Sequence, residues 1–137
     1  MAKCLIYAAP ATSLNIFDPL LCLKIERDGI VVLGSPIGSP EFVKNYVRGK
    51  VNGAAAIMES TAALNDPQSE LLLLRCCTGA PKMVYWLRTC ISDVIREPIF
   101  DFDIEVDKTL QRILGTPLGD LDRMLMHLPL SLGGLYC

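Results

Sequence analysis

The chain has 137 residues, 51% of them hydrophobic and 20% charged, and its net charge is −2. These values predict one domain that buries about two thirds of its unfolded surface, and they argue against disorder. The acidic balance argues against strong autonomous nucleic-acid binding, because free-standing binders are usually basic. Charge is uneven, however: residues 1–92 carry nine basic and seven acidic side chains, whereas residues 93–137 carry four and eight. A polyanion contact is therefore expected in the first two thirds.

The cysteine pattern favours free thiols over disulfides or a metal site. The spacing is irregular, there is no CxxC pair, and the first nine residues lack the apolar run and cleavage site of a secretory signal. We therefore expect small, mostly buried thiols and an intracellular location, cytoplasm or nucleus. No apolar run reaches the roughly 20 residues of a membrane span, so no membrane partner is expected. The cysteines are Cys4, Cys22, Cys76, Cys77, Cys90 and Cys137.

The first 38 residues read as short strands. Residues 4–9 form an apolar run typical of a buried strand, and residues 21–26 alternate as in a half-buried strand. Asp28-Gly29 is a hairpin-turn signal, which makes residues 30–33 the returning strand. Residues 34–38 then close the hairpin, and their two glycines permit a tight backbone path or the close approach of another chain.

A first helix is predicted from Ser39 to about Leu64. Ser39 is a hydroxyl cap, and a proline and an acid follow it in the first turn, where both are favoured. Apolar residues then keep helical spacing at Val43, Val47, Val51, Ala54 and Met58.

The stretch from Asp66 to Cys90 is the expected centre of the fold. Asp66 and Pro67 start a helix in which four consecutive leucines, residues 71–74, are distributed around almost the whole circumference. This predicts a helix that is surrounded by other helices. Gly79 and Pro81 interrupt the chain. A second, amphipathic helix is predicted after them, ending before Pro98, with an apolar stripe of Met83, Leu87, Cys90, Ile91 and Val94.

Two more helices and a tail complete the prediction. Asp101 or Asp103 caps a helix that ends at Gly115, with a stripe of Val106, Leu110, Ile113 and Leu114. A short helix carrying Leu121, Met124, Leu125 and Leu128 stops at Pro129, and residues 129–137 form an extended, glycine-containing tail. The expected class is mainly α (α+β): a small N-terminal β-hairpin element, residues 1–38, followed by a bundle of four to five helices within residues 39–128, all in one compact unit.

Signals for catalysis are weak. His127 is best interpreted as a surface or interface histidine, because no serine or cysteine nucleophile can be assigned to it. The acids Asp101, Asp103, Glu105 and Asp107 are interpreted as a solvated helix terminus, since a period of two does not face one side of a helix. No phosphate-loop, dinucleotide or zinc-protease motif occurs.

Basic residues leave two interpretations open, an ordinary solvated face or a track of phosphate contacts. Lys44 and Arg48 share a helix face and Lys50 lies to the side, while Arg75, Lys82 and Arg88 add charge on the following helices. Phosphate contacts need only such side chains and backbone N–H groups.

An ordered set of segments resembles a known family. A Lys-Cys near the start is followed by GIVVLGSPIGSPEFV, DPQSELLLLRCCTGAPKMVYWLRT, an FD-led helix with LQRILG, and LPLSLGGL. This order is similar to the region after the catalytic palm in reverse transcriptases of non-LTR (LINE-like) retrotransposons. The similarity extends from about Lys3 to Leu135.

The resemblance implies roles for particular residues. Val32-Leu33-Gly34 resembles the Leu-Gly of the primer-grip hairpin, where the backbone lies against the primer end, and Lys3 falls at a lysine of the last palm motif. The helices from Ser39 to Arg96 correspond to the thumb, which grips template–primer duplex. The implied nucleic-acid contacts are Lys3, Leu33, Gly34, Lys44, Arg48, Lys82 and Arg88.

The resemblance also implies that functional parts are missing. The paired aspartates that hold two metal ions for phosphoryl transfer would lie before Lys3, and the family continues past the segment matched by Gly134. We therefore expect a fragment that is not an enzyme on its own and needs no cofactor, although the intact polymerase would use magnesium. Weak, sequence-independent duplex contact is the leading function. The alternatives are a helical protein-interaction module, docking for example on a palm domain as the mean hydropathy of +0.37 allows, or a non-functional remnant of a mobile element.

Overall fold

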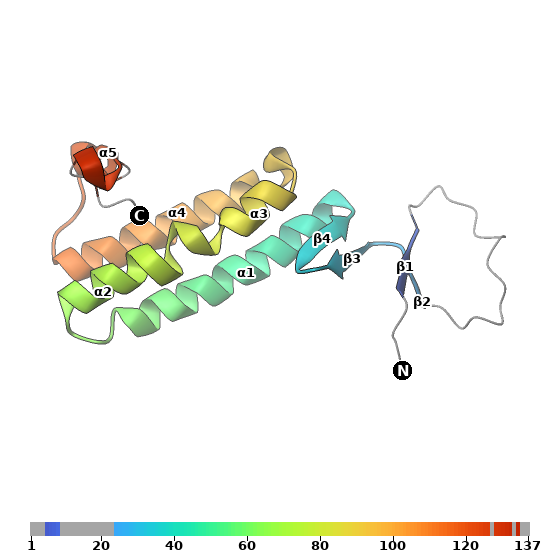
Figure 1. Cartoon of the computed structure of the whole chain (residues 1–137), viewed down its shortest axis with the longest axis horizontal. Coiled ribbons are helices and arrows are strands. Elements are labelled where there is room, and N and C mark those ends of the chain that lie inside the picture. The colour runs from blue at the N-terminus through green and yellow to red at the C-terminus, as the bar shows by residue number, and fades with distance from the viewer. Residues whose placement is uncertain (1–4, 9–23, 127, 133, 135–137) are drawn as a thin grey trace.

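The computed structural model describes residues 5–8, 24–126, 128–132 and 134, which form the elongated arrangement of Figure 1. Short strands come first, and helices make up most of the remaining chain. The predicted class, mainly α with a small N-terminal β-hairpin element and a helical bundle, is confirmed. Across the described residues, no helix has both the length and the apolar character needed to cross a bilayer.

Two strand pairs precede the first helix. β1 (Leu5–Tyr7) pairs in parallel with β2 (Lys24–Glu26), and β3 (Gly29–Val32) pairs in antiparallel register with β4 (Ser35–Gly38). The hairpin predicted through Asp28-Gly29 is wrong, since the chain only bends there and reverses at Leu33-Gly34. A packing contact explains the glycine: a Cβ at Gly29 would lie 2.3 Å from the ring of Phe42.

Helix α1 (Pro40–Thr61) forms as predicted. The Ser39 side chain accepts a hydrogen bond from the Phe42 amide at 3.3 Å, which satisfies one of the free N–H groups of the first turn. The five apolar residues that keep helical spacing in the sequence are all buried. This stripe therefore forms one side of the core.

The predicted central segment is a chain of short helical pieces. It comprises α2 (Pro67–Leu73), a π-helical turn (Leu74–Thr78), a 3₁₀ turn (Ala80–Lys82) and α3 (Val84–Thr89). The Asp66 cap is confirmed, with its carboxylate accepting from the Gln68 amide. The expectation that the leucines are buried on all sides is wrong: Leu74 is fully buried, whereas Leu72 is 59% exposed. The segment has neighbours on one side only, so a leucine pointing away from them meets solvent.

The helix boundary expected before Pro98 is also wrong. The break falls at Cys90 and Ile91, and α4 (Ser92–Leu114) continues through Pro98. A proline inside a helix removes one backbone hydrogen bond, but Pro98 is fully buried, and its packing in the core offsets that loss. Asp101 and Asp103 consequently lie within α4 and cap nothing. The predicted end is confirmed, since Gly115 adopts a left-handed conformation with φ 66°.

The last helix, α5 (Asp120–Met126), does not bury the residues predicted for it. Leu121, Met124 and Leu125 are each more than half exposed, and Met126 is buried instead. The tail contains a 3₁₀ turn (Leu130–Leu132), so the described part of it is not simply extended. Arg123 of α5 forms an ion pair with Asp107 of α4, with Nε and Oδ2 3.1 Å apart.

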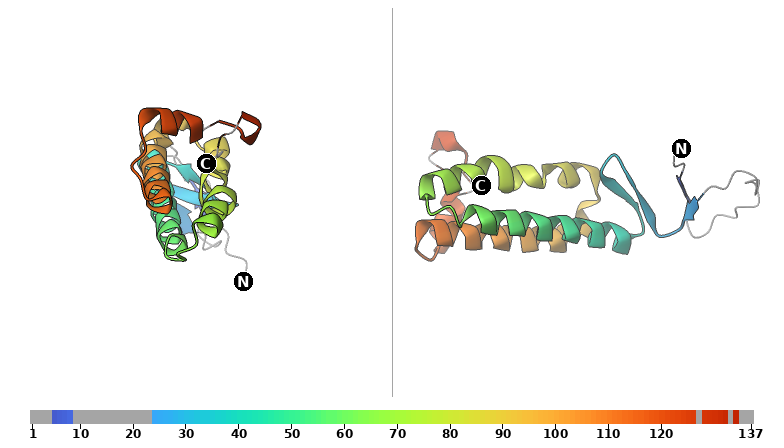
Figure 2. Two further views of the ribbon diagram at one scale, coloured as in Figure 1. Left: turned by 90° about the vertical axis from the view of Figure 1, so that its left-hand side faces the viewer. Right: turned by 90° about the horizontal axis from the view of Figure 1, so that it is seen from below.

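The core lies between two parallel helices and the segment that returns along them. In the views of Figure 2, α1 and α4 lie side by side and run in the same direction, while residues 67–89 run in the opposite direction along them. The β3–β4 hairpin lies at the end where α1 and α4 begin, opposite α5. The buried cluster contains Val43, Val47, Val51, Ala54, Met58, Leu74, Met83, Ile95, Phe102, Val106, Leu110, Ile113 and Met126.

Candidate nucleic-acid interface

The tip of the β3–β4 hairpin is a two-residue turn at Leu33-Gly34. Both residues have positive φ, 51° and 85°, which is the backbone combination of a type I′ turn. Glycine adopts this conformation without strain, but leucine does not. The Leu33 side chain is 94% exposed, so the burial of an apolar group does not offset the strain.

Three aromatic side chains bind this turn to the helical bundle. The Tyr85 hydroxyl donates to the Leu33 carbonyl at 2.7 Å. The Trp86 indole N–H and the Tyr46 hydroxyl both donate to the Gly34 carbonyl at 3.3 Å. Side-chain donors on α1 and α3 therefore hold the turn by binding its backbone carbonyl groups. We call Tyr46, Tyr85 and Trp86 the aromatic clamp.

Sequence reasoning missed the clamp. It gave no role to Tyr46, Tyr85 or Trp86. Trp86 is the single tryptophan of the chain, which is a signal worth attention, but its partner lies 52 positions away in the sequence. No local spacing rule links residues so far apart.

Positive charge lies beside the clamp. Arg88 is exposed on α3, which carries Tyr85 and Trp86, and Lys82 is exposed on the 3₁₀ turn that precedes this helix. Within the described part of the chain, neither forms an ion pair. Lys50, which the sequence placed to the side, lies with its Nζ 5.1 Å from the ring centroid of Tyr46. Lys50 and Arg88 thus come from α1 and α3, the two helices that hold the hairpin tip, and Lys82 lies on the turn just before α3.

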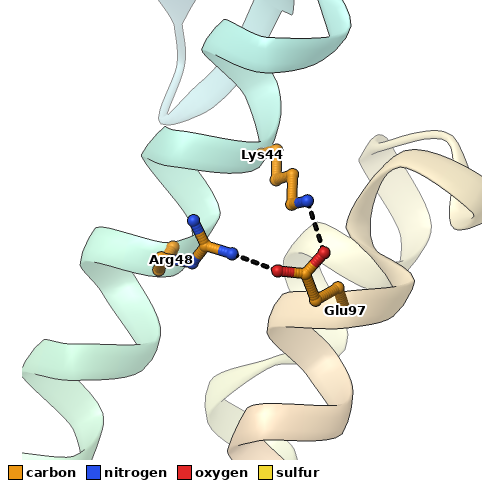
Figure 3. Close-up of polar contacts among 3 residues, drawn as sticks. All are labelled: Lys44, Arg48 and Glu97. Atoms are coloured by element: carbon orange, nitrogen blue, oxygen red, sulfur yellow. Dashed lines mark hydrogen bonds and ion pairs between the residues drawn. The ribbon is translucent and has the colours of Figure 1, made fainter.

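Lys44 and Arg48 occupy a different environment. They do share a face of α1, as predicted, but both donate to the carboxylate of Glu97 on α4, as Figure 3 shows. The bond from Lys44, together with the charges of Lys44 and Arg48, lowers the pKa of Glu97, partly opposed by desolvation. Glu97 therefore stays ionised at neutral pH, and the two cations share one anion.

The remaining predicted candidates contribute no site. Lys3 and His127 lie outside the described residues. Of the acids on α4, Glu105 pairs with Lys108 at 2.6 Å and Asp107 pairs with Arg123, so they do not form the solvated helix terminus expected for them. In residues 5–8, 24–126, 128–132 and 134, no group of three or more metal-binding side chains comes together.

The thiols differ from the prediction. Cys76 and Cys77 are exposed on the π-helical turn, and Cys90 is partly buried at the α3–α4 junction, so the described cysteines are not mostly buried.

Comparison with known proteins adds no assignment. The chain matches no protein-family model, no curated protein and no solved structure.

The candidate interface comprises the Leu33-Gly34 turn, the aromatic clamp and the neighbouring cations.

Proposed function

We propose that this chain is a primer-grip and thumb-like piece of a reverse-transcriptase-like polypeptide of a non-LTR retrotransposon. In this proposal it contacts template–primer duplex through phosphates, without reading sequence and without catalysing polymerisation. The motif order given above suggests the ancestry. The observation that supports a duplex contact is the attachment of the Leu33-Gly34 turn to α3, the helix on which Arg88 is exposed.

Physical chemistry favours a phosphate contact at this place. Lys82 and Arg88 are free of acidic partners in the described chain, so an approaching phosphate need not displace a carboxylate from either of them. Lysine and arginine contacts to phosphate supply affinity that does not depend on base sequence. The exposed ring of Tyr85 adds a flat apolar surface beside them.

The test is a fluorescence-anisotropy titration of a labelled RNA–DNA duplex over a range of salt concentrations. Binding should weaken with added salt, with a slope of log K against log salt of about −0.9 for each phosphate contact. The double variant Lys82→Ala with Arg88→Ala should lose affinity on duplexes of any sequence and flatten the slope by about 0.9 for each phosphate no longer bound.

A matched control removes the same charge elsewhere. Arg96 and Lys108 are exposed on α4, and each already pairs with an acid of its own helix. Arg96→Ala with Lys108→Ala should change duplex binding less than the first double variant. Equal losses for both variants would reduce the effect to net charge and reject the site, and no binding at low salt would reject the duplex contact itself.

A second candidate function is a helical protein-interaction module. The exposed apolar face of α5, formed by Leu121, Met124 and Leu125, favours it, because contiguous apolar surface of this kind marks interaction sites. Native mass spectrometry distinguishes the two functions. A defined oligomer that Leu121→Ser with Leu125→Ser converts to monomer supports the module, whereas a monomer that shifts only with added duplex supports the thumb-like role.

A further inference from the structure

Lys44, Arg48 and Glu97 form one shared polar contact between α1 and α4. Lys44 Nζ donates to one carboxylate oxygen and an Arg48 Nη donates to the other, so the two cations converge on one anion from neighbouring turns of α1 (Figure 3). All three side chains remain partly exposed, with exposed fractions of 34%, 40% and 56% in that order. A solvent-borne anion can therefore reach both donors.

The two carboxylate oxygens mark a place that suits a phosphate. An ammonium and a guanidinium that each bind one oxygen of a carboxylate can each bind one oxygen of a phosphodiester, because both groups offer charged oxygen acceptors of similar spacing. Exposed ion pairs of this kind contribute little to stability, so their replacement by another anion costs little.

We propose that Lys44 and Arg48 form a phosphodiester-binding pair that Glu97 occupies in the free chain. Glu97 is then an internal competitor: it holds both side chains in place and lowers the affinity of the α1 face for polyanions. This inference rests on the proposed function for its natural ligand, a nucleic-acid backbone. It adds a second contact region on α1, separate from Lys82 and Arg88, and a residue that regulates it.

Glu97→Gln is the direct test, because glutamine keeps the size of the side chain and removes its charge. The matched control is Asp93→Asn, which removes one negative charge one helical turn earlier on α4. Asp93 pairs only with Arg96 of its own helix in the described structure, with Nη2 and Oδ1 3.3 Å apart. The two variants therefore have the same net charge, and only one of them frees Lys44 and Arg48.

The measurement is duplex anisotropy against salt concentration for the wild type and both variants. Glu97→Gln should bind several-fold more tightly at low salt and steepen the salt slope by about 0.9 for each additional phosphate that is bound. Asp93→Asn should leave the slope unchanged. Adding Lys44→Ala and Arg48→Ala to Glu97→Gln should cancel the increase in affinity.

The outcomes separate this inference from the proposed function. If all three proteins bind duplex and Glu97→Gln behaves like Asp93→Asn, the inference is overturned and the proposed function stands. If only Glu97→Gln binds, the inference stands, and the proposed function fails for the native chain. If none binds at low salt, both are overturned.

Discussion

Replacement of Leu33 by asparagine should stabilise the chain. Leu33 has φ 51°, a conformation that costs leucine roughly 1–2 kcal/mol but that asparagine adopts readily. Its side chain is 94% exposed, so almost no apolar burial is lost. The sequence of the turn becomes Asn-Gly, which is the preferred pair for a type I′ hairpin. We expect a gain of about 1 kcal/mol, or roughly 3–5 °C in Tm for a domain of this size.

The assay is urea denaturation followed by far-UV circular dichroism and by tryptophan fluorescence. Trp86 is the only tryptophan and donates its indole N–H to the Gly34 carbonyl, so its emission reports whether the turn stays attached to the bundle. Both signals should shift to higher urea in Leu33→Asn. Leu33→Gly should gain less, because glycine adds freedom to the unfolded chain.

A control with the same chemical change should have the opposite sign. Leu72 is exposed within α2, where asparagine forms helix less readily than leucine, so Leu72→Asn should destabilise by a few tenths of a kcal/mol. If Leu33→Asn lowers stability as well, Leu33 is not strained, and the assignment of the turn is refuted.

Three further predictions use other parts of the fold. Leu74→Ala should cost about 2–5 kcal/mol in urea denaturation because Leu74 is fully buried, whereas Leu72→Ala should stay within about 0.5 kcal/mol; equal costs would contradict the observed burial. Gly38→Ala should cost about 1–3 kcal/mol by the same assay, because the added methyl would lie 2.4 Å from the backbone of the neighbouring strand. The Ser69 hydroxyl, more than any other group, lowers the pKa of Asp66 below 3.8, so the stabilisation by this cap is complete above pH 3.8 and is lost as pH falls through the folded-state pKa. Thermal melts of Asp66→Asn should therefore lack this acid-dependent loss, and identical pH profiles would contradict it.

The capping residues in the sequence correctly predicted where α1 and α2 begin. Ser39 and Asp66 cap helices because their side-chain oxygens satisfy N–H groups two or three residues away, an interaction contained within a few positions. The buried stripe of α1 follows for a similar reason, since a period of 3.6 residues places apolar side chains on one face whatever packs against it.

Errors arose where a neighbour distant in sequence decided the outcome. Pro98 reads as a helix end, yet burial in the core holds it inside α4. Asp28-Gly29 reads as a hairpin turn, yet the close approach of Phe42 accounts for the glycine, and the chain reverses at a strained Leu33 instead. In both cases packing outweighed a local preference for a different backbone path.

The same distinction applies to the candidate interface. The sequence by itself determined that the chain is mainly helical, where α1 and α2 begin, and that Lys44 and Arg48 share a face, because these features depend on residues within one or two helical turns. Only the tertiary structure decided that the Glu97 carboxylate accepts hydrogen bonds from those two cations. It also decided that Tyr46, Tyr85 and Trp86 hold the hairpin tip. Except for the bond from Tyr46, these contacts join residues about fifty positions apart, and the packing of α1 against α4 and of α3 against the hairpin brings them together.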